Sequence, residues 1–404
     1  MSYPTEVRKE NNVLLIDFGT QYVKCSVMKE GTLIDDILLL PNRIYSISEE
    51  RAKALAQEQK GEITIPTGLF TQKEIEEAKL LFQAEEAFVM SDATPDNMEL
   101  VAKGYQNICE QIDKQLSYSG ADAISGNYAN WAVMIAVAAF ETAEGRKQVE
   151  EFHIKATKKM NFKSIYINNQ LMFDYFSQIN YLEQIGAKPG YCMIIDIGGG
   201  DTKVGGVSGL PIQESFRRFN IGGQEITRYC QNILRERYNV SGTAYETIES
   251  WLIEGGTVDG NSPETKKMFK RKEVDIKDIL NTPEMLFDYS KYYKKDRRFN
   301  SITEILIESI EAVIEKSEAG IELLLGAVIV AGGASRFNGI TQRLNKELST
   351  YFSEYKDQIN VIVGEDPQNA CINGMRSLIT QKYKSSNPGL AFIDLQALDE
   401  EDEE

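Results

Sequence analysis

The sequence predicts an α/β protein, in which buried strands alternate with amphipathic helices. Three short apolar runs, residues 12–19, 192–199 and 326–333, each end in glycine, as is typical of central strands covered on both faces. Stretches with apolar residues at helical spacing lie between and after these runs. The chain has 404 residues, which is enough for two compact domains rather than one core.

The predicted helices are defined by their apolar spacing and, in one case, by a cap. Ser301 and Glu304 form a capping box at the start of the helix before the third strand. A second helix begins at Ile340, and a third follows Gln170. The apolar positions of these three helices are Ile302, Ile305, Leu306, Ile310, Val313 and Ile314; Ile340, Leu344, Leu348 and Phe352; and Leu171, Met172, Tyr175, Phe176, Ile179 and Leu182.

Composition and charge exclude several classes of function. The net charge is −17 and the pI is about 4.8, which argues against generic nucleic-acid binding, because a basic face would be expected. The polar start does not read as a signal peptide. The longest apolar run, residues 131–140, has about half the length that a bilayer span needs. We therefore expect a cytoplasmic protein without membrane insertion.

The cysteines and the single histidine argue against disulfide, metal-centre and triad chemistry. The five cysteines are scattered singly, and we expect reduced thiols in a cytosolic interior. His153 lies in a predicted helix, where a structural or surface role is expected. Two irregular regions, residues 41–95 and 255–300, are interpreted as peripheral subdomains or surface insertions. Residues 396–404 form an acidic tail, which we expect to be solvated and disordered.

Two stretches with the same pattern carry the main functional signal. Residues 16–24, "IDFGTQYVK", and 195–203, "IDIGGGDTK", each read as a strand, a tight glycine turn and a second strand. Glycines let backbone N–H groups approach an anion, and successive turn amides form a concave nest for phosphate. Asp17 and Asp196 would repel phosphate directly, so we expect them to hold the water shell of a Mg²⁺ ion between them and the phosphate.

The two hairpins together predict a clasp for a triphosphate. The expected phosphate-binding residues are Gly19, Thr20, Gln21, Tyr22 and Lys24 in the first turn, and Gly198, Gly199, Gly200, Asp201 and Thr202 in the second. One copy alone would fit an ordinary turn equally well, but two copies that each close a buried strand favour the binding role. Neither copy is a Walker A loop, and no GxGxxG fingerprint opens a helix.

A third glycine signal lies in "VAGGASRFNGI", residues 330–340, where Gly332 and Gly333 end a strand before a helix. Close backbone approach at this turn, with Ala334 following, suits a flat ring such as adenine, and Phe337 is a candidate packing partner. This signal is weak alone, because such turns are common. It supports a nucleotide site more strongly because it follows the two hairpins along the chain in the order expected for such a site.

The order of these motifs resembles the superfamily of actin, heat-shock-chaperone and sugar-kinase ATPases. Within it, "IYINNQLMFDYFSQ", "NIGGQEITRYCQNILRERYNV" and "AVIVAGGASRFNGITQRLNKEL" are most similar to actins, and "VGEDPQNACINGM" to a crenactin-like prokaryotic or archaeal branch. The similarity is dense at residues 12–28, 128–235 and 302–378 and poor at 41–125 and 255–300.

The resemblance implies a fold of two related ribonuclease-H-like domains flanking a nucleotide cleft, each with a smaller peripheral subdomain. The expected first domain is 1–185, with core segments 10–40 and 126–185, peripheral residues 41–125 and the C-terminal segment 365–395. The expected second domain is 186–364, with core segments 186–222 and 300–364 and peripheral residues 223–299.

The resemblance also implies residue roles. Gln170 stands at the place of actin's catalytic glutamine. Gly223 would approach the nucleotide, Thr227 would start the long helix, and Glu254 would contact the ribose. Two departures stand out, because Lys203 replaces a histidine of actin and Gly199 replaces an aspartate of eukaryotic actin. The region that matches actin's DNase-binding loop cannot be aligned, so no filament contact is carried over.

The expected function is an ATPase whose nucleotide state controls polymerisation, with ATP or ADP and Mg²⁺ as ligands and other copies of the chain as partners. Gln170 would orient a water molecule in line with the γ-phosphate, unless it is merely an exposed first-turn residue. The alternatives are a sugar or carboxylate kinase, a chaperone ATPase and a nucleotide-binding scaffold that does not polymerise. The acidic end disfavours a membrane-anchored division protein.

Overall fold

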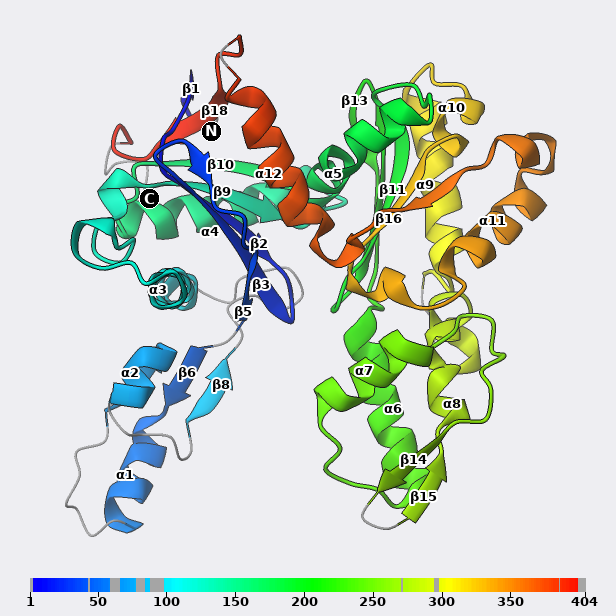
Figure 1. Ribbon diagram of the computed structural model, residues 1–404, viewed down its shortest axis with the longest axis horizontal. Coiled ribbons are helices and arrows are strands. Elements are labelled where there is room, and N and C mark those ends of the chain that lie inside the picture. Colours follow the sequence, from blue (N-terminus) through cyan, green and yellow to red (C-terminus); the bar gives the residue numbers. More distant parts are fainter. Residues whose placement is uncertain are drawn as a thin grey trace. The chain divides into compact units, whose positions relative to one another are not determined.

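The computed structural model describes residues 3–42, 44–58, 66–77, 84–87, 98–269, 272–293, 298–384 and 386–398. The chain forms two compact units, whose elements are labelled in Figure 1. The first unit contains residues 1–137, 147–168 and 378–404, and the second contains 138–146 and 169–377. The predicted acidic tail lies outside the described residues from position 399 onward.

An eight-stranded sheet forms the core of the first unit, in the order β1-β18-β10-β9-β2-β3-β4, with β5 paired to β3. Every residue of β2 and β9 is buried, as the apolar runs predicted for central strands. β2 pairs antiparallel with β3 and parallel with β9. The strands are β1 Thr5–Arg8, β2 Val13–Phe18, β3 Tyr22–Lys29, β4 Thr32–Leu33, β5 Leu38–Pro41, β9 Ala132–Val137, β10 Ser164–Asn169 and β18 Leu390–Asp394.

A smaller sheet in the first unit has the order β7-β6-β8. Ile47, Ala52 and Leu55 make its small apolar core. It lies within the irregular region predicted at 41–95, part of which is outside the described residues. The elements in and around the smaller sheet are β6 Ile44–Ile47, α1 Glu49–Glu58, β7 Gly68–Phe70, α2 Gln72–Glu77 and β8 Glu85–Ala87. Two longer helices follow in the sequence, α3 Met98–Leu116 and α4 Ala143–Lys159.

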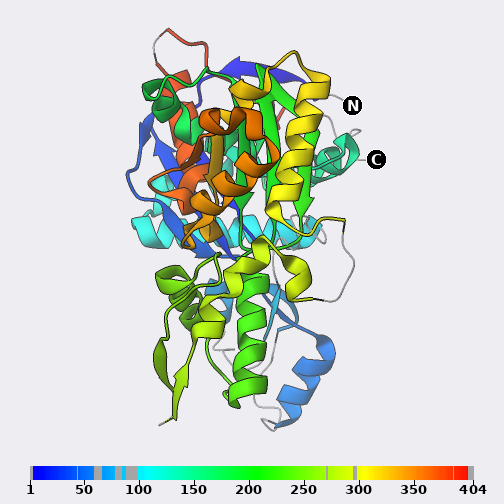
Figure 2. The ribbon, with the colours of Figure 1, turned by 90° about the vertical axis from the view of Figure 1, so that its right-hand side faces the viewer.

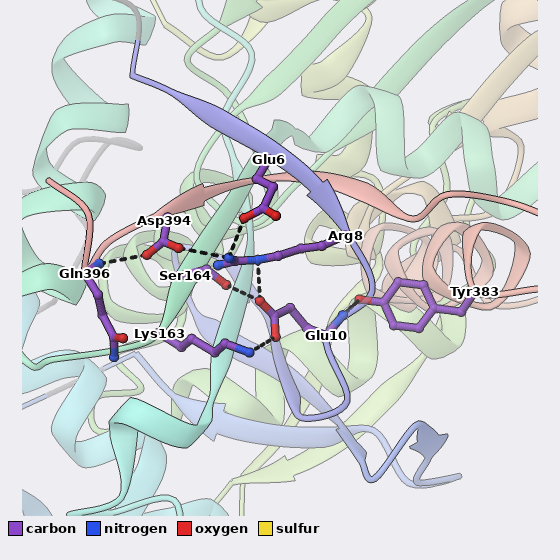
Figure 3. Close-up of polar contacts among 8 residues, drawn as sticks. All are labelled: Glu6, Arg8, Glu10, Lys163, Ser164, Tyr383, Asp394 and Gln396. Carbon is purple, nitrogen blue, oxygen red and sulfur yellow. Dashed lines mark hydrogen bonds and ion pairs between the residues drawn. The ribbon is translucent and has the colours of Figure 1, made fainter.

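Hydrogen bonds and ion pairs between side chains connect the strands at the β1 edge of the first unit's large sheet (Figure 3). The buried carboxylate of Glu10 lies 2.6 Å from Arg8 Nε, 2.7 Å from Lys163 Nζ and 3.0 Å from Ser164 Oγ. Arg8 also bonds Asp394 of β18 at 2.9 Å. Segments from both ends of the sequence are therefore joined to β10 by hydrogen-bonded charges as well as by the strand ladder.

The second unit is built on a five-stranded sheet in the order β13-β12-β11-β16-β17. β11, β12 and β13 form an antiparallel meander, and β16 and β17 continue the sheet in parallel to β11. Both large sheets thus combine an antiparallel hairpin with a parallel neighbour on its first strand. The strands are β11 Tyr191–Ile197, β12 Thr202–Ser208, β13 Leu210–Phe219, β16 Val328–Ala331 and β17 Val361–Val363.

Two helices pack on this sheet through alternate residues of β11. Helix α5, Gln170–Gln184, shares a buried cluster with Cys192 and Ile194. Helix α9, Ile302–Lys316, shares another with Met193 and Ile195, and lies along the strands as the yellow helix of Figure 2. Successive strand residues point to opposite faces, so each face of β11 has its own helix.

Two glycines of β12 let these helices come close. A Cβ on Gly205 would lie 2.4 Å from the ring of Phe216, and one on Gly206 would lie 2.3 Å from Cγ2 of Val313. Glycine is needed here because neighbouring side chains already fill the space on both faces. The pair in "KVGGV" therefore has a packing role, separate from the glycines of the preceding turn.

The helix predicted after Ser301 is confirmed, and its cap is half of the predicted box. Ser301 Oγ accepts a hydrogen bond from the Glu304 amide at 3.1 Å, but the Glu304 carboxylate accepts from the amide of Asn300. Of the predicted apolar positions, Ile314 is 37% exposed. The other elements of this unit are α6 Gly223–Tyr238, α7 Tyr245–Gly255, β14 Lys266–Phe269, β15 Lys272–Asp275, α8 Lys277–Leu280, α10 Ile321–Leu325 and α11 Ile340–Tyr351. Helix α12, Ala370–Lys382, is divided between the two units at residues 377 and 378.

The contacts of α5 differ from the expected domain boundary at 185/186. Leu171, Met172, Tyr175 and Leu182 pack with the sheet of the second unit, although the sequence analysis assigned them to the first domain. The C-terminal segment returns to the first unit, because β18 pairs with β1 and β10. The expected division into domains and subdomains stays a prediction.

The single histidine is buried in the first unit. His153 is 0% exposed, and its Nδ1 lies 2.7 Å from the hydroxyl of Tyr105. Its Nε2 is buried without a hydrogen-bond partner among the described residues, and the ring of Phe18 lies 5.3 Å away. The structural role expected for His153 is confirmed. All five cysteines are also buried, and none forms a disulfide.

We predict that His153 makes the first unit sensitive to acid. Burial lowers its pKa to about 3, whereas the unfolded chain has the ordinary value near 6.5. The unfolded state therefore binds more protons, and stability is lost as the pH falls from about 6.5 toward 3, by about 1.4 kcal/mol per pH unit. Urea unfolding at pH 7 and pH 5 should show this loss for the native chain and a smaller loss for His153→Gln. Equal losses would contradict the prediction.

Candidate functional site

The two predicted hairpins are present and have the same register. Asp17 lies directly opposite Lys24 across β2 and β3, and Asp196 lies opposite Lys203 across β11 and β12. Each aspartate is the last residue but one of a buried strand and lies next to a glycine turn. The strand–turn–strand interpretation of both stretches is therefore confirmed.

The first turn is closed by its own backbone and by one side chain from β5's end. The Gly19 amide donates to the carbonyl of Asp17 at 3.1 Å, and a Cβ on Gly19 would lie 2.6 Å from the carbonyl oxygen of Tyr22. The buried Asn42 donates from Nδ2 to the carbonyls of Gly19 and Thr20, at 3.0 and 3.2 Å. Sequence reasoning missed Asn42, since nothing local connects it with a turn more than twenty residues upstream.

Lys24 contacts Asp17 within the first hairpin. Its Nζ lies 3.0 Å from Asp17 Oδ2, and the Asp17 side chain is 2% exposed. The sequence analysis predicted instead that Lys24 meets a phosphate oxygen. The ammonium group is at the turn, as that role requires, and its contact in the structure is an ion pair.

The second turn is joined to the start of α6 by backbone hydrogen bonds. The Gly198 amide donates to the carbonyl of Asp201, while the amides of Gly223 and Gln224 donate to the carbonyls of Gly198 and Gly199, at 3.0 and 2.7 Å. A Cβ on Gly222 would lie 2.6 Å from both of these carbonyl oxygens. The turn and the helix start are thus in direct contact, with no space for a side chain between them. The helix begins at Gly223, four residues before the start predicted at Thr227, because the turn carbonyls already bond its first amides.

The third glycine segment reaches the same place from β16. Gly332 has φ of +87°, and a Cβ on it would lie 2.4 Å from Asp196 Oδ1 and from the Ile197 carbonyl. Its amide donates to the carbonyl of Pro367 at 2.8 Å. Glycine is required here both by the left-handed backbone and by the close approach. Ala334 continues the segment, and its Cβ would lie 3.8 Å from a Cβ on Gly223.

The second unit therefore brings together three stretches that the sequence analysis selected. They contribute Asp196, Gly198, Gly199, Gly200, Asp201, Thr202, Gly223, Gly332, Gly333 and Ala334. The first-turn residues Asp17, Gly19, Thr20, Gln21, Tyr22 and Lys24 belong to the first unit. Whether the two sets face one ligand stays a prediction.

Three other predicted residues lie in the second unit with less direct support. Gln170 is the first residue of α5 after the cap Asn169, and it is 7% exposed, so it is not an exposed first-turn glutamine. Glu254 lies on α7, where it accepts a hydrogen bond from Ser250 at 2.9 Å. Phe337 is 5% exposed and belongs to the apolar core, so its packing partners are side chains of that core.

A buried charge network surrounds the second turn. Lys203 Nζ lies 2.7 Å from Asp201 Oδ1 and 3.5 Å from Asp196 Oδ2, and Arg218 Nε lies 2.5 Å from Asp201 Oδ2. Lys203 and Arg218 are direct cross-strand neighbours, so their like charges would repel without Asp201 between them. Sequence reasoning missed Arg218, because its role depends on the register of β12 with β13.

The charges of this network are held by each other. Burial would raise the pKa of Asp201, but Lys203 and Arg218 keep it below its ordinary value. Burial would lower the pKa of Lys203, but Asp201 and then Asp196 keep it above its ordinary value. Both groups therefore remain ionised at neutral pH, although each side chain is at most 6% exposed.

The donor groups fit Mg²⁺ better than a metal that requires a protein cage. Among the described residues, no cluster of three or more His, Cys, Asp or Glu side chains could hold a metal ion. Mg²⁺ keeps several waters and is typically bound through one or two carboxylates together with substrate phosphates. Asp196, at the edge of a glycine-lined turn, supplies a carboxylate of that kind.

Comparison with known proteins assigns the class and then the family. The two hairpins and the glycine turns described above are consistent with the fold of the actin-like ATPases. The model of the Actin family matches residues 9–274 and 276–372, and the chain belongs to the actin family. No curated protein matches the chain. The family match does not distinguish the crenactin-like branch, which stays a prediction. No helix in the described part of the chain is long and apolar enough to cross a membrane.

We predict that Gly222→Ala destabilises the second unit. The new methyl group would lie 2.6 Å from two carbonyl oxygens, so the turn or the helix start must move. Overpacking of this kind costs about 1–3 kcal/mol of unfolding free energy. Gly223→Ala is the matched control, because its Cβ would meet nothing closer than 3.8 Å. Urea unfolding measured by fluorescence should separate the two variants, and equal midpoints would contradict this reading of the contact.

Proposed function

We propose that this actin-family protein binds ATP with Mg²⁺, hydrolyses it and assembles into nucleotide-dependent filaments. The observation that carries the proposal is the convergence of the second turn, the start of α6 and the Gly332 segment next to Asp196. Backbone at this convergence is close-packed and lined by glycine, which suits approach of an anion and a flat ring. The duplicated hairpin in the first unit supports a second contact with the same ligand.

Each of the two units is proposed to carry one phosphate-binding turn. The first turn, with Gly19 to Tyr22, and the second turn, with Gly198 to Thr202, would each offer backbone amides to the phosphates. Asp17 and Asp196 would hold the ion through its water molecules. Bound Mg²⁺ would supply positive charge to the phosphate oxygens, which favours departure of the γ-phosphate.

Gln170 is the proposed group that orients the attacking water. Phosphoryl transfer requires positioning and charge stabilisation more than covalent chemistry, and a neutral amide can position water without accepting its proton. The first turn of α5 is fixed by Asn169, whose side chain accepts a hydrogen bond from the Met172 amide at 2.9 Å. This cap and the burial of Gln170 limit the orientations of its side chain.

Filament formation is proposed from family membership, with other copies of the chain as partners and the cytoplasm as location. A chain that repeats one head-to-tail contact without closure produces a helical filament. A sugar or carboxylate kinase of the same superfamily would need a catalytic base, and Gln170 is a poor one. A nucleotide-binding scaffold that does not assemble is the other alternative.

The first experiment is sedimentation with light scattering. We predict pelleting above a threshold protein concentration with Mg²⁺ and ATP, and less pelleting with ADP or without nucleotide. Binding of a fluorescent ATP analogue is measured on the same samples. Binding without pelleting would leave the scaffold or the kinase, and a screen of small hydroxyl compounds for accelerated ATP turnover separates these two. No binding would overturn the proposed nucleotide site.

Gln170→Ala should slow ATP hydrolysis by about 100-fold or more while ATP affinity changes little, because positioning acts mainly in the transition state. Gln184→Ala, at the exposed far end of the same helix, is the matched control and should hydrolyse at the native rate. Phosphate release in single-turnover experiments is the measurement. Unchanged hydrolysis in Gln170→Ala would remove its assigned role.

A further inference from the structure

The two hairpins share the aspartate, the first glycine of the turn and the lysine, but they differ at one turn position that bears charge. Counting from the aspartate near the end of the hairpin's first strand, the lysine is seven residues on in both, as Lys24 and Lys203. Five residues on, the first hairpin has Tyr22 and the second has Asp201. The second hairpin therefore has one extra carboxylate within reach of its lysine.

The lysines make different contacts as a result. Lys24 Nζ lies 3.0 Å from Asp17 Oδ2. Lys203 Nζ lies 2.7 Å from Asp201 Oδ1 and only 3.5 Å from Asp196 Oδ2. The ammonium of the second hairpin is thus closer to the extra carboxylate of Asp201 than to Asp196 on the strand.

Asp201 is itself held in place. Its other oxygen, Oδ2, is 2.5 Å from Arg218 Nε, and its backbone carbonyl accepts from the Gly198 amide at 2.9 Å. The backbone amide of Arg218 donates to the carboxylate of Glu141 at 3.1 Å. Because Arg218 holds the Asp201 carboxylate in place, Lys203 cannot move toward Asp196 and keep its close contact with Asp201.

We infer that Asp201 is a positioning residue that holds the Lys203 ammonium off Asp196, so that Asp196 remains able to bind the water shell of the nucleotide's Mg²⁺. This inference rests on the proposed nucleotide site. An ammonium and a hydrated cation compete for the same carboxylate oxygens, and in a buried site their competition is poorly screened by solvent. Asp201 favours binding of the hydrated cation at Asp196, because it gives the Lys203 ammonium a nearer carboxylate partner.

The test is the Mg²⁺ dependence of nucleotide binding in Asp201→Asn. Without the nearer carboxylate, Lys203 should move onto Asp196, and the Mg²⁺ concentration for half-maximal binding of a fluorescent ATP analogue should rise about 10-fold. Direct binding of Mn²⁺ in the presence of ADP, followed by electron paramagnetic resonance, should weaken in parallel. Asp278→Asn is the matched control, because it removes an exposed carboxylate that pairs with Arg237.

Two further variants isolate the lysine. Lys203→Met should lower the Mg²⁺ requirement below that of the native chain, because the competing cation is gone and Asp201 keeps Arg218 as a partner. Combining Lys203→Met with Asp201→Asn should abolish the 10-fold rise, as expected when two residues act through one contact. Lys203→Met remains a test if Asp201→Asn does not fold.

The outcomes distinguish this inference from the proposed function. An unchanged Mg²⁺ requirement in both Asp201→Asn and Lys203→Met, with nucleotide still bound, would overturn the inference and leave the nucleotide site standing. A rise in Asp201→Asn that persists in the double variant would also overturn it, because the effect would not pass through Lys203. Absence of nucleotide binding by the native chain would overturn both.

Discussion

The site in the second unit depends on backbone contacts that leave no room for a Cβ. Gly222 lies against the carbonyls of Gly198 and Gly199, and Gly332 lies against Asp196 and the Ile197 carbonyl. These glycines are more than 100 residues apart at the extremes, yet all meet at the end of β11. The geometry of the turn is therefore set by main chain from three places, and side-chain rearrangement cannot alter it.

Charge at this convergence is arranged by the strand register. The pairing of β12 with β13 places Lys203 and Arg218 opposite one another. The carboxylate of Asp201 forms ion pairs with both and so offsets the repulsion between their like charges. Buried ion pairs contribute little net stability when compared with apolar residues of similar size, because desolvation opposes their attraction. We therefore interpret the network as a means of keeping charges at defined positions in a largely apolar sheet.

The local parts of the fold were predictable from the sequence, and the non-local parts were not. Strands β2 and β11, the two hairpins and the helices after Gln170 and Ser301 follow from the period of apolar residues and from turn residues, which act between neighbours along the chain. Ile314 lies at the helical spacing of the buried apolar residues, yet it is 37% exposed. Only tertiary contacts decide how far along the helix its apolar face is buried.

The same distinction applies to the site. The glycines and aspartates were found because their spacing repeats, whereas Asn42 and Arg218 were missed because their partners lie far away along the chain. Lys24 was identified at the turn, but its ion pair with Asp17 depends on cross-strand geometry. Packing of α5 on the second sheet likewise depends on contacts that no local pattern encodes.

The position of β18 has a consequence for how the chain folds as it is synthesised. β18 lies between β1 and β10 in the large sheet of the first unit, and β1 is held by the ladder from Thr5 to Arg8. β1 must therefore wait for residues 390–394, which are synthesised much later, before it finds its place. The sheet of the second unit needs nothing beyond β17, so it can be complete while the edge of the first sheet is still open.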